Sequence, residues 1–136
     1  MSSISAIALS GLNAASLRLQ VSASNVANAG STGTLPNANG TVPAGSPQAY
    51  APLEVVQSAS AGGGVQTSVT TVTPSTTAAF DPQASFANQD GLVAAPNVDL
   101  ASEFVGQLLA SYSYAANAIV LKADDRMTQS LLDITA

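Results

Sequence analysis

The sequence predicts a mainly α-helical chain whose long N- and C-terminal helices pair as a coiled-coil-like hairpin, with a small irregular and β-hairpin region between them. Apolar residues recur at three- and four-residue spacing near both ends of the 136-residue chain, and a stretch rich in Gly, Pro, Ser and Thr separates them. We therefore divide the chain into an N-terminal helical part, 1–30, a loop and β-hairpin middle region, 31–95, and a C-terminal helical part, 96–136.

The first helix is expected over about residues 4–28. Its apolar stripe consists of Ile4, Ala8, Leu12, Ala15, Leu19 and Val26. Ser2 or Ser3 can cap its start, because a serine hydroxyl accepts a hydrogen bond from a free N–H of the first turn. Gly30 and Gly33 end the helix.

The middle region is expected to hold a loop followed by one hairpin. Val and Thr favour strands, and a run of three glycines favours a long hairpin loop between them. The expected elements are a loop at 30–47, strands at 51–57 and 65–73, a glycine connection at 62–64, and turns at 81–82 and 90–91.

The second helix is expected over about residues 98–134, a rod of roughly 55 Å at 1.5 Å per residue. Its stripe recurs near every 3.5 residues and consists of Val105, Leu108, Leu109, Tyr112, Ala116, Ile119, Ala123 and Met127. Asn97 or Asp99 can cap its start.

Charge is too scarce for several classes of function. The chain carries three basic and eight acidic residues, a net charge of −5. Nucleic-acid binding needs clustered Lys and Arg, and anionic membranes repel a net negative chain. Charged residues are 8% of the chain, against about a quarter in an average soluble domain. We therefore expect outer faces that are disordered or covered by other subunits.

No catalytic, cofactor or metal site is expected. The chain contains no His and no Cys, so acid–base chemistry would need a tuned carboxylate pair, which no spacing here suggests. The glycines at 62–64 lack the lysine and helix of a phosphate loop. A non-enzyme without cofactor or small-molecule substrate is expected.

Neither a cleaved secretory signal nor a membrane span is expected. The N-terminus lacks a basic region followed by an apolar core, and no apolar run approaches 18 residues. If the protein leaves the cytoplasm, another export route carries it.

Both ends of the chain resemble the flagellar rod and hook axial proteins. The matching stretches are SGLNAASLR at 10–18, NVAN at 25–28, EFV at 103–105 and SYAAN at 113–117. In the middle, FDP at 80–82, DGLV at 90–93 and PNVD at 96–99 resemble proximal-rod proteins of the FlgC type. The segment after Ala29 departs from the family by being longer and richer in Ala and Gly.

The resemblance implies a structural subunit of the flagellar basal-body proximal rod, in the part of the flagellum that spans the periplasm. It implies self-assembly with copies of itself and other rod proteins into the tubular drive shaft. Export then runs through the flagellar type III apparatus without a cleaved signal, and the terminal helices are disordered until they stack side by side.

The candidate subunit-interface residues lie on the two helical stripes: Leu12, Ala15, Leu19, Asn25, Asn28, Val105, Leu109, Tyr112, Tyr114, Asn117 and Ile119. Asn25 and Asn28 either bond to backbone at an inter-subunit joint or mark a frayed helix end. Asn117, within an apolar stripe, either sets register or faces solvent. Arg18 either lies on a solvated face or forms a cross-subunit salt bridge with Glu103 or Asp99.

Other functions stay open. One is a different flagellar axial protein, such as a hook or distal-rod fragment, and another is a secreted disordered binding module with two amphipathic ends. The uncharged middle argues against the binding module, because disordered segments usually carry high charge. A hydrolase would need a nucleophile and base that the sequence does not show.

Overall fold

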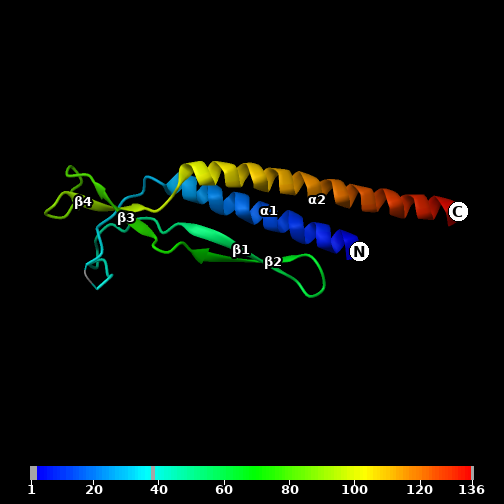
Figure 1. The fold of residues 1–136 in the computed structure, drawn as a ribbon, viewed down its shortest axis with the longest axis horizontal. Coiled ribbons are helices and arrows are strands. Elements are labelled where there is room, and N and C mark those ends of the chain that lie inside the picture. The colour runs from blue at the N-terminus through cyan, green and yellow to red at the C-terminus, as the bar shows by residue number, and fades with distance from the viewer. Residues whose placement is uncertain (1–2, 38, 136) are drawn as a thin grey trace.

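The computed structural model describes residues 3–37 and 39–135 as an elongated chain of two helices and four strands (Figure 1). The elements are α1 (Ser3–Asn28), β1 (Leu53–Ala59), β2 (Val65–Thr71), β3 (Thr76–Phe80), β4 (Leu92–Pro96) and α2 (Leu100–Thr135). The helices run antiparallel side by side. The β1–β2 hairpin lies along α1, and β3 and β4 lie beyond the end of α1 that is far from both termini (Figure 1).

The predicted fold class is wrong: the chain is mixed α/β, 47% helical and 19% strand, rather than mainly α. Two strands that were not predicted, β3 and β4, flank the turns expected at 81–82 and 90–91. The coiled-coil-like description also fails, since a coiled coil buries large residues at its seam. Here the buried apolar residues of the helices are mostly small: Ala8, Ala14, Ala15, Val21 and Ala110.

Two antiparallel sheets of two strands each make up the middle region. β1 pairs with β2 from Leu53↔Thr71 to Ala59↔Val65, so the expected hairpin is present, with β1 two residues later than predicted. β3 pairs with β4 from Thr76↔Pro96 to Phe80↔Leu92.

Strand β4 has a neighbour on each side. Opposite β3, the Gly33 N–H donates to the Ala94 carbonyl at 2.9 Å, and the Ala94 N–H donates to the Gly33 carbonyl at 2.8 Å. Val93 and Ala94 are buried at 0% and 2% exposure, so β4 forms the core of this end of the molecule. The loop after α1 is therefore fastened to the sheet rather than free.

Gly33 has no room for a side chain, which gives a testable expectation. A Cβ built there would collide with backbone atoms of Gln48 and Ala49. We expect Gly33→Ala to lower the free energy of unfolding by about 3 kcal/mol, because backbone must move to relieve the overlap. Denaturant titration followed by circular dichroism measures this. Gly30→Ala is the control, since nothing lies within 4 Å of its Cβ position; equal unfolding midpoints for the two variants would contradict the expectation.

Candidate subunit interface

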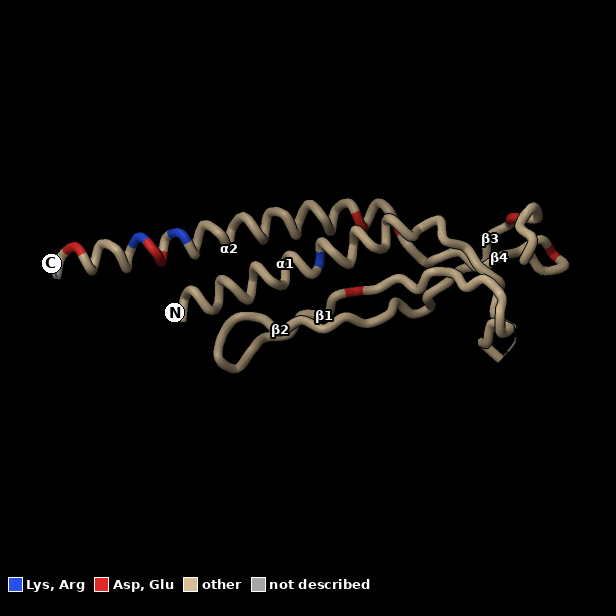
Figure 2. The backbone as a smooth tube through the Cα atoms, turned by 180° about the vertical axis from the view of Figure 1, so that it is seen from behind, with Lys and Arg blue, Asp and Glu red and all other residues tan. Residues whose placement is uncertain are grey.

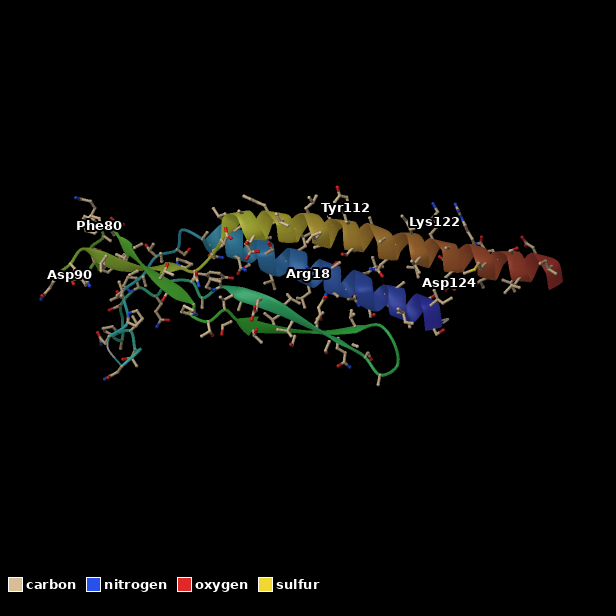
Figure 3. The ribbon with its side chains drawn as sticks, viewed as in Figure 1. Arg18, Phe80, Asp90, Tyr112, Lys122 and Asp124 are labelled. Carbon is tan, nitrogen blue, oxygen red and sulfur yellow. The ribbon has the colours of Figure 1, made fainter. Side chains whose placement is uncertain are left out.

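The large apolar side chains of α2 lie on the outside of the molecule. More than half of the surface is exposed for Phe104, Val105, Leu108, Leu109, Tyr112, Ile119, Met127, Leu131, Leu132 and Ile134. Figure 3 shows Tyr112 directed away from α1. An exposed apolar area of this size marks a site of interaction with another protein or a membrane. We refer to the side chains just named as the α2 apolar surface.

Charged residues are scarce in the helix pair except in the C-terminal part of α2. Figure 2 shows α1 and the first two thirds of α2 with few charged residues, whereas the basic residues of α2 lie toward its C-terminus. By length and composition, Leu100–Ile134 would be able to cross a membrane, although it contains no uninterrupted apolar run of 18 residues. A single helix of this kind is weak evidence for a membrane span.

The predicted interface residues do not form one surface. Ala15 and Asn25 are buried within the chain at 3% and 2% exposure. Leu12, Asn28 and Asn117 are half-buried. The exposed residues are Leu19, Val105, Leu109, Tyr112, Tyr114 and Ile119. These six are available to a neighbouring subunit, whereas Ala15 and Asn25 already have partners within the chain.

A shallow groove runs between the helices beside several of these residues. It has a volume of about 320 Å³ and is lined by Ala15, Ser16, Leu19, Ala110, Ser111 and Tyr114. Ala15 and Ala110, both buried, are small enough to let the helices approach closely. Leu19 and Tyr114 are the two large side chains that line the groove, and both are exposed.

Asn25 joins three parts of the chain through its side-chain amide. Its Nδ2 donates to the Leu53 carbonyl at 2.8 Å and to Glu103 Oε1 at 2.6 Å. Its Oδ1 accepts from the Leu53 N–H and the Tyr50 hydroxyl, both at 3.0 Å. Asn25 was predicted to bond to backbone between subunits or to mark a frayed end; in the structure it bonds to backbone of the same chain and ties α1 to β1 and α2.

The other two asparagines are held within their own helices. Asn28 Nδ2 donates to the Ser24 carbonyl at 2.9 Å, and Asn117 Nδ2 donates to the Ser113 carbonyl at 2.8 Å. Asn117 also fills the space above Gly11, where a Cβ would lie 2.6 Å from Asn117 Cγ. Asn117 thus packs against α1 within the chain, and the register role considered for it is still a prediction.

Sequence reasoning missed a polar contact at the other end of the helix pair. The Ser5 hydroxyl donates to the Asp124 carboxylate, and both residues are buried, at 8% and 6% exposure. Figure 3 shows Asp124 directed toward α1 and Lys122 directed away from it. No local signal distinguishes Asp124 from the adjacent Asp125, so only the helix pairing identifies it. Together with the Asn25–Glu103 contact, it fixes the antiparallel alignment at both ends.

Arg18 lies near two carboxylates but forms an ion pair with neither. It lines a cavity of about 170 Å³ with Glu54 and Glu103. Within residues 3–37 and 39–135, Arg18 has no ion pair at 4 Å or less. The predicted cross-subunit salt bridge of Arg18 is thus still a prediction.

Asp99 is the N-cap of α2. Its Oδ1 accepts from the Ala101 N–H at 3.0 Å, and its Oδ2 accepts from the Ser102 hydroxyl at 2.6 Å. Asn97, the other predicted cap, instead donates to the Pro74 carbonyl at 2.9 Å. The hydrogen bond from Ser102, and then that from Ala101, holds the pKa of Asp99 below its usual value.

The lowered pKa predicts how this cap responds to acid. A carboxyl with a lower pKa in the folded state stabilises the fold above its unfolded pKa, and this contribution is lost as pH falls through the folded pKa. We expect Asp99→Asn to reduce the loss of helix content between neutral and acidic pH, measured by far-UV circular dichroism. Asp81→Asn, in a turn outside the helix, is the control. Identical acid titrations for wild type and Asp99→Asn would contradict the role of Asp99.

The chain is similar in sequence to flagellar basal-body rod proteins. The family model described as "Flagellar basal body rod FlgEFG protein C-terminal" matches residues 89–134. A flagellar basal-body rod protein FlgC from Yersinia enterocolitica is 39% identical over 132 residues, 93% of this chain and 88% of the relative. FlgC proteins from Salmonella typhimurium and Escherichia coli O157:H7 are 34% and 37% identical, each covering 94% of this chain and 92% of the relative.

Proposed function

Because the chain belongs to the FlgC family of flagellar basal-body rod proteins, we propose that the α2 apolar surface binds neighbouring subunits in the proximal rod. The chain is a structural rod subunit of the flagellar basal body. Family membership implies assembly with other rod and basal-body components. The proposal adds that copies of this chain and other rod proteins cover the α2 apolar surface and form the tubular drive shaft.

The observation that carries this proposal is the exposure of α2. Leu109, Tyr112 and Ile119 are 52%, 66% and 69% exposed along one helix. Burial of apolar surface contributes about 25 cal/mol per Å², so covering these side chains favours assembly strongly. The same surface is unfavourable when it is exposed to water in a monomer. A large apolar area in a chain of low charge therefore fits a subunit whose surface is covered in an assembly.

Two further parts of the proposal concern export and chemistry. The chain passes through the flagellar type III export apparatus without a cleaved signal, in a partly unfolded state, and its helices reach their full stability in the rod that spans the periplasm. The protein has no catalytic activity, in keeping with a family whose members are structural.

The test is complementation of a strain that lacks the gene for this chain. We expect the wild-type chain to restore swimming, and labelled chain to appear in the rod of purified basal bodies by electron microscopy. A second arm blocks type III export and measures whether the chain stays in the cytoplasm. Label confined to the hook or filament would overturn the rod position, and secretion despite the block would overturn the export route.

A further inference from the structure

The β1–β2 hairpin has two open edges. In an antiparallel pair, alternate residues direct their N–H and C=O groups toward the partner strand or away from it. The Val72 N–H donates to the Pro52 carbonyl at 2.9 Å, and the Ser60 N–H donates to the Gly64 carbonyl at 3.1 Å. In the register of this hairpin, even-numbered residues therefore face the partner strand and odd-numbered residues face outward. The outward residues are Leu53, Val55, Gln57 and Ala59 on β1, and Val65, Thr67, Val69 and Thr71 on β2.

Helix α1 occupies one end of each edge. Asn25 bonds to both main-chain groups of Leu53 on β1. The Ser10 hydroxyl accepts from the Val65 N–H on β2 at 3.1 Å. The helix thus lies along the hairpin and bonds to the main chain of β1 at Leu53 and of β2 at Val65. For Val55, Gln57 and Ala59 on β1 and Thr67, Val69 and Thr71 on β2, no described residue bonds to the outward groups.

These edges lack the features that keep strand edges apart. Monomeric proteins protect an edge with a Lys, a Pro, a bulge or a covering segment. Strand β2 has the sequence VQTSVTT, with no charge and no Pro. Strand β1 has one charged residue, Glu54, whose main-chain groups face β2. Its Oε1 accepts a hydrogen bond from the Thr70 hydroxyl at 3.3 Å. Edges of this kind are suited to pairing with another strand.

The two open edges match one another. Each presents three outward residues at two-residue spacing, and each is uncharged along its outward positions. If β2 of one copy runs antiparallel to β1 of the next, Thr67, Val69 and Thr71 lie opposite Ala59, Gln57 and Val55. We propose that the β1–β2 hairpins of adjacent copies of this chain join edge to edge in this register and form a continuous sheet outside the helices.

The geometry of this contact suits a tubular assembly. The β2 edge of one copy meets the β1 edge of the next, so the interface is heterologous, and its repetition generates a ring or an open helix rather than a closed dimer. This inference rests on the proposed rod function, and it adds a specific contact between copies that the α2 apolar surface does not provide.

Disulfide cross-linking tests the register directly, because the chain contains no Cys of its own. In the proposed register Ser68 of one copy faces Ser58 of the next in a non-hydrogen-bonded pair, where Cα atoms lie about 4.5 Å apart. Both serines are exposed. The variants Ser58→Cys and Ser68→Cys are expressed from separate gene copies in the deletion strain, basal bodies are isolated under oxidation, and dimers are resolved by non-reducing electrophoresis.

We expect a disulfide-linked dimer when both variants are present and little when either is present alone. Ser58→Cys with Thr70→Cys is the register control, because this pair is shifted by two residues and its Cα atoms lie roughly 7–8 Å apart. Equal cross-linking of the two pairs, or none in rods that contain both variants, would overturn the proposal. A cross-link of Ser68→Cys to a different rod protein would also overturn it.

A proline substitution supplies a second, independent readout. Val69→Pro removes an outward N–H and leaves the bonds between β1 and β2 intact, which edge strands tolerate. We expect this variant to lose swimming while its isolated chain keeps the hairpin protection of wild type in hydrogen exchange. Val69→Ala controls for loss of the side chain. Full swimming of Val69→Pro would contradict edge pairing, whereas a wild-type chain that never reaches the rod would contradict the proposed function instead.

Discussion

Leu109→Asp is expected to abolish swimming while the isolated chain keeps its fold. Leu109 is 52% exposed in the α2 apolar surface, so a carboxylate there stays solvated in the free subunit and changes its stability little. In the assembled rod the same carboxylate would lose its water, which costs several kcal/mol in every copy. Swimming in soft agar and thermal unfolding of the purified chain measure the two effects separately.

Leu109→Met is the matched control, because it keeps an apolar side chain of similar volume. We expect it to swim as wild type does. Normal swimming of Leu109→Asp as the only copy in the cell would show that this part of α2 is not buried in the rod. A large loss of stability in the purified Leu109→Asp chain would instead show that Leu109 packs within the subunit.

Asn25→Ala is expected to lower the free energy of unfolding by about 3 kcal/mol, since buried partners left without a hydrogen bond each cost about 1–3 kcal/mol. The substitution leaves the Leu53 N–H and carbonyl and the Glu103 carboxylate without their bonds to the amide. Denaturant titration of the purified chain measures the loss, and swimming is expected to fail as well, because β1 is no longer held against α1.

Asn28→Ala is the control for this experiment. It removes an asparagine three residues later in the same helix, and its amide bonds to the carbonyl of Ser24 four residues before it. We expect a change well under half of that caused by Asn25→Ala. Similar losses in the two variants would show that the network around Asn25 adds nothing beyond its helical position.

Both helices could be predicted from the sequence because their signals are local. α1 and α2 lie within one or two residues of the predicted ends, and Asp99 was one of two cap candidates. The β1–β2 hairpin was also predicted, since Val and Thr flank a run of glycines. Strands β3 and β4 were missed because they are short and rich in Ala, and because β4 is completed by Gly33, some sixty residues away in the chain.

The sequence by itself determined that helices lie at both ends, that charge is too scarce for an isolated surface, and that the chain resembles rod proteins. Periodicity and composition carry this information without reference to any partner. Only the tertiary structure decided which side of each helix is used within the subunit. Both helices have apolar residues around much of their circumference, so periodicity alone does not orient them.

The alignment of the helices was decided by residues with no local signal. Ser5 reaches Asp124, Asn117 covers Gly11, and Asn25 reaches Glu103. Each contact depends on a partner about eighty or more residues away, and the antiparallel pairing brings all of them together at once. That pairing buries small residues and leaves Leu109, Tyr112 and Ile119 outside, because close approach of two helices requires small side chains at the seam and excludes large ones from it.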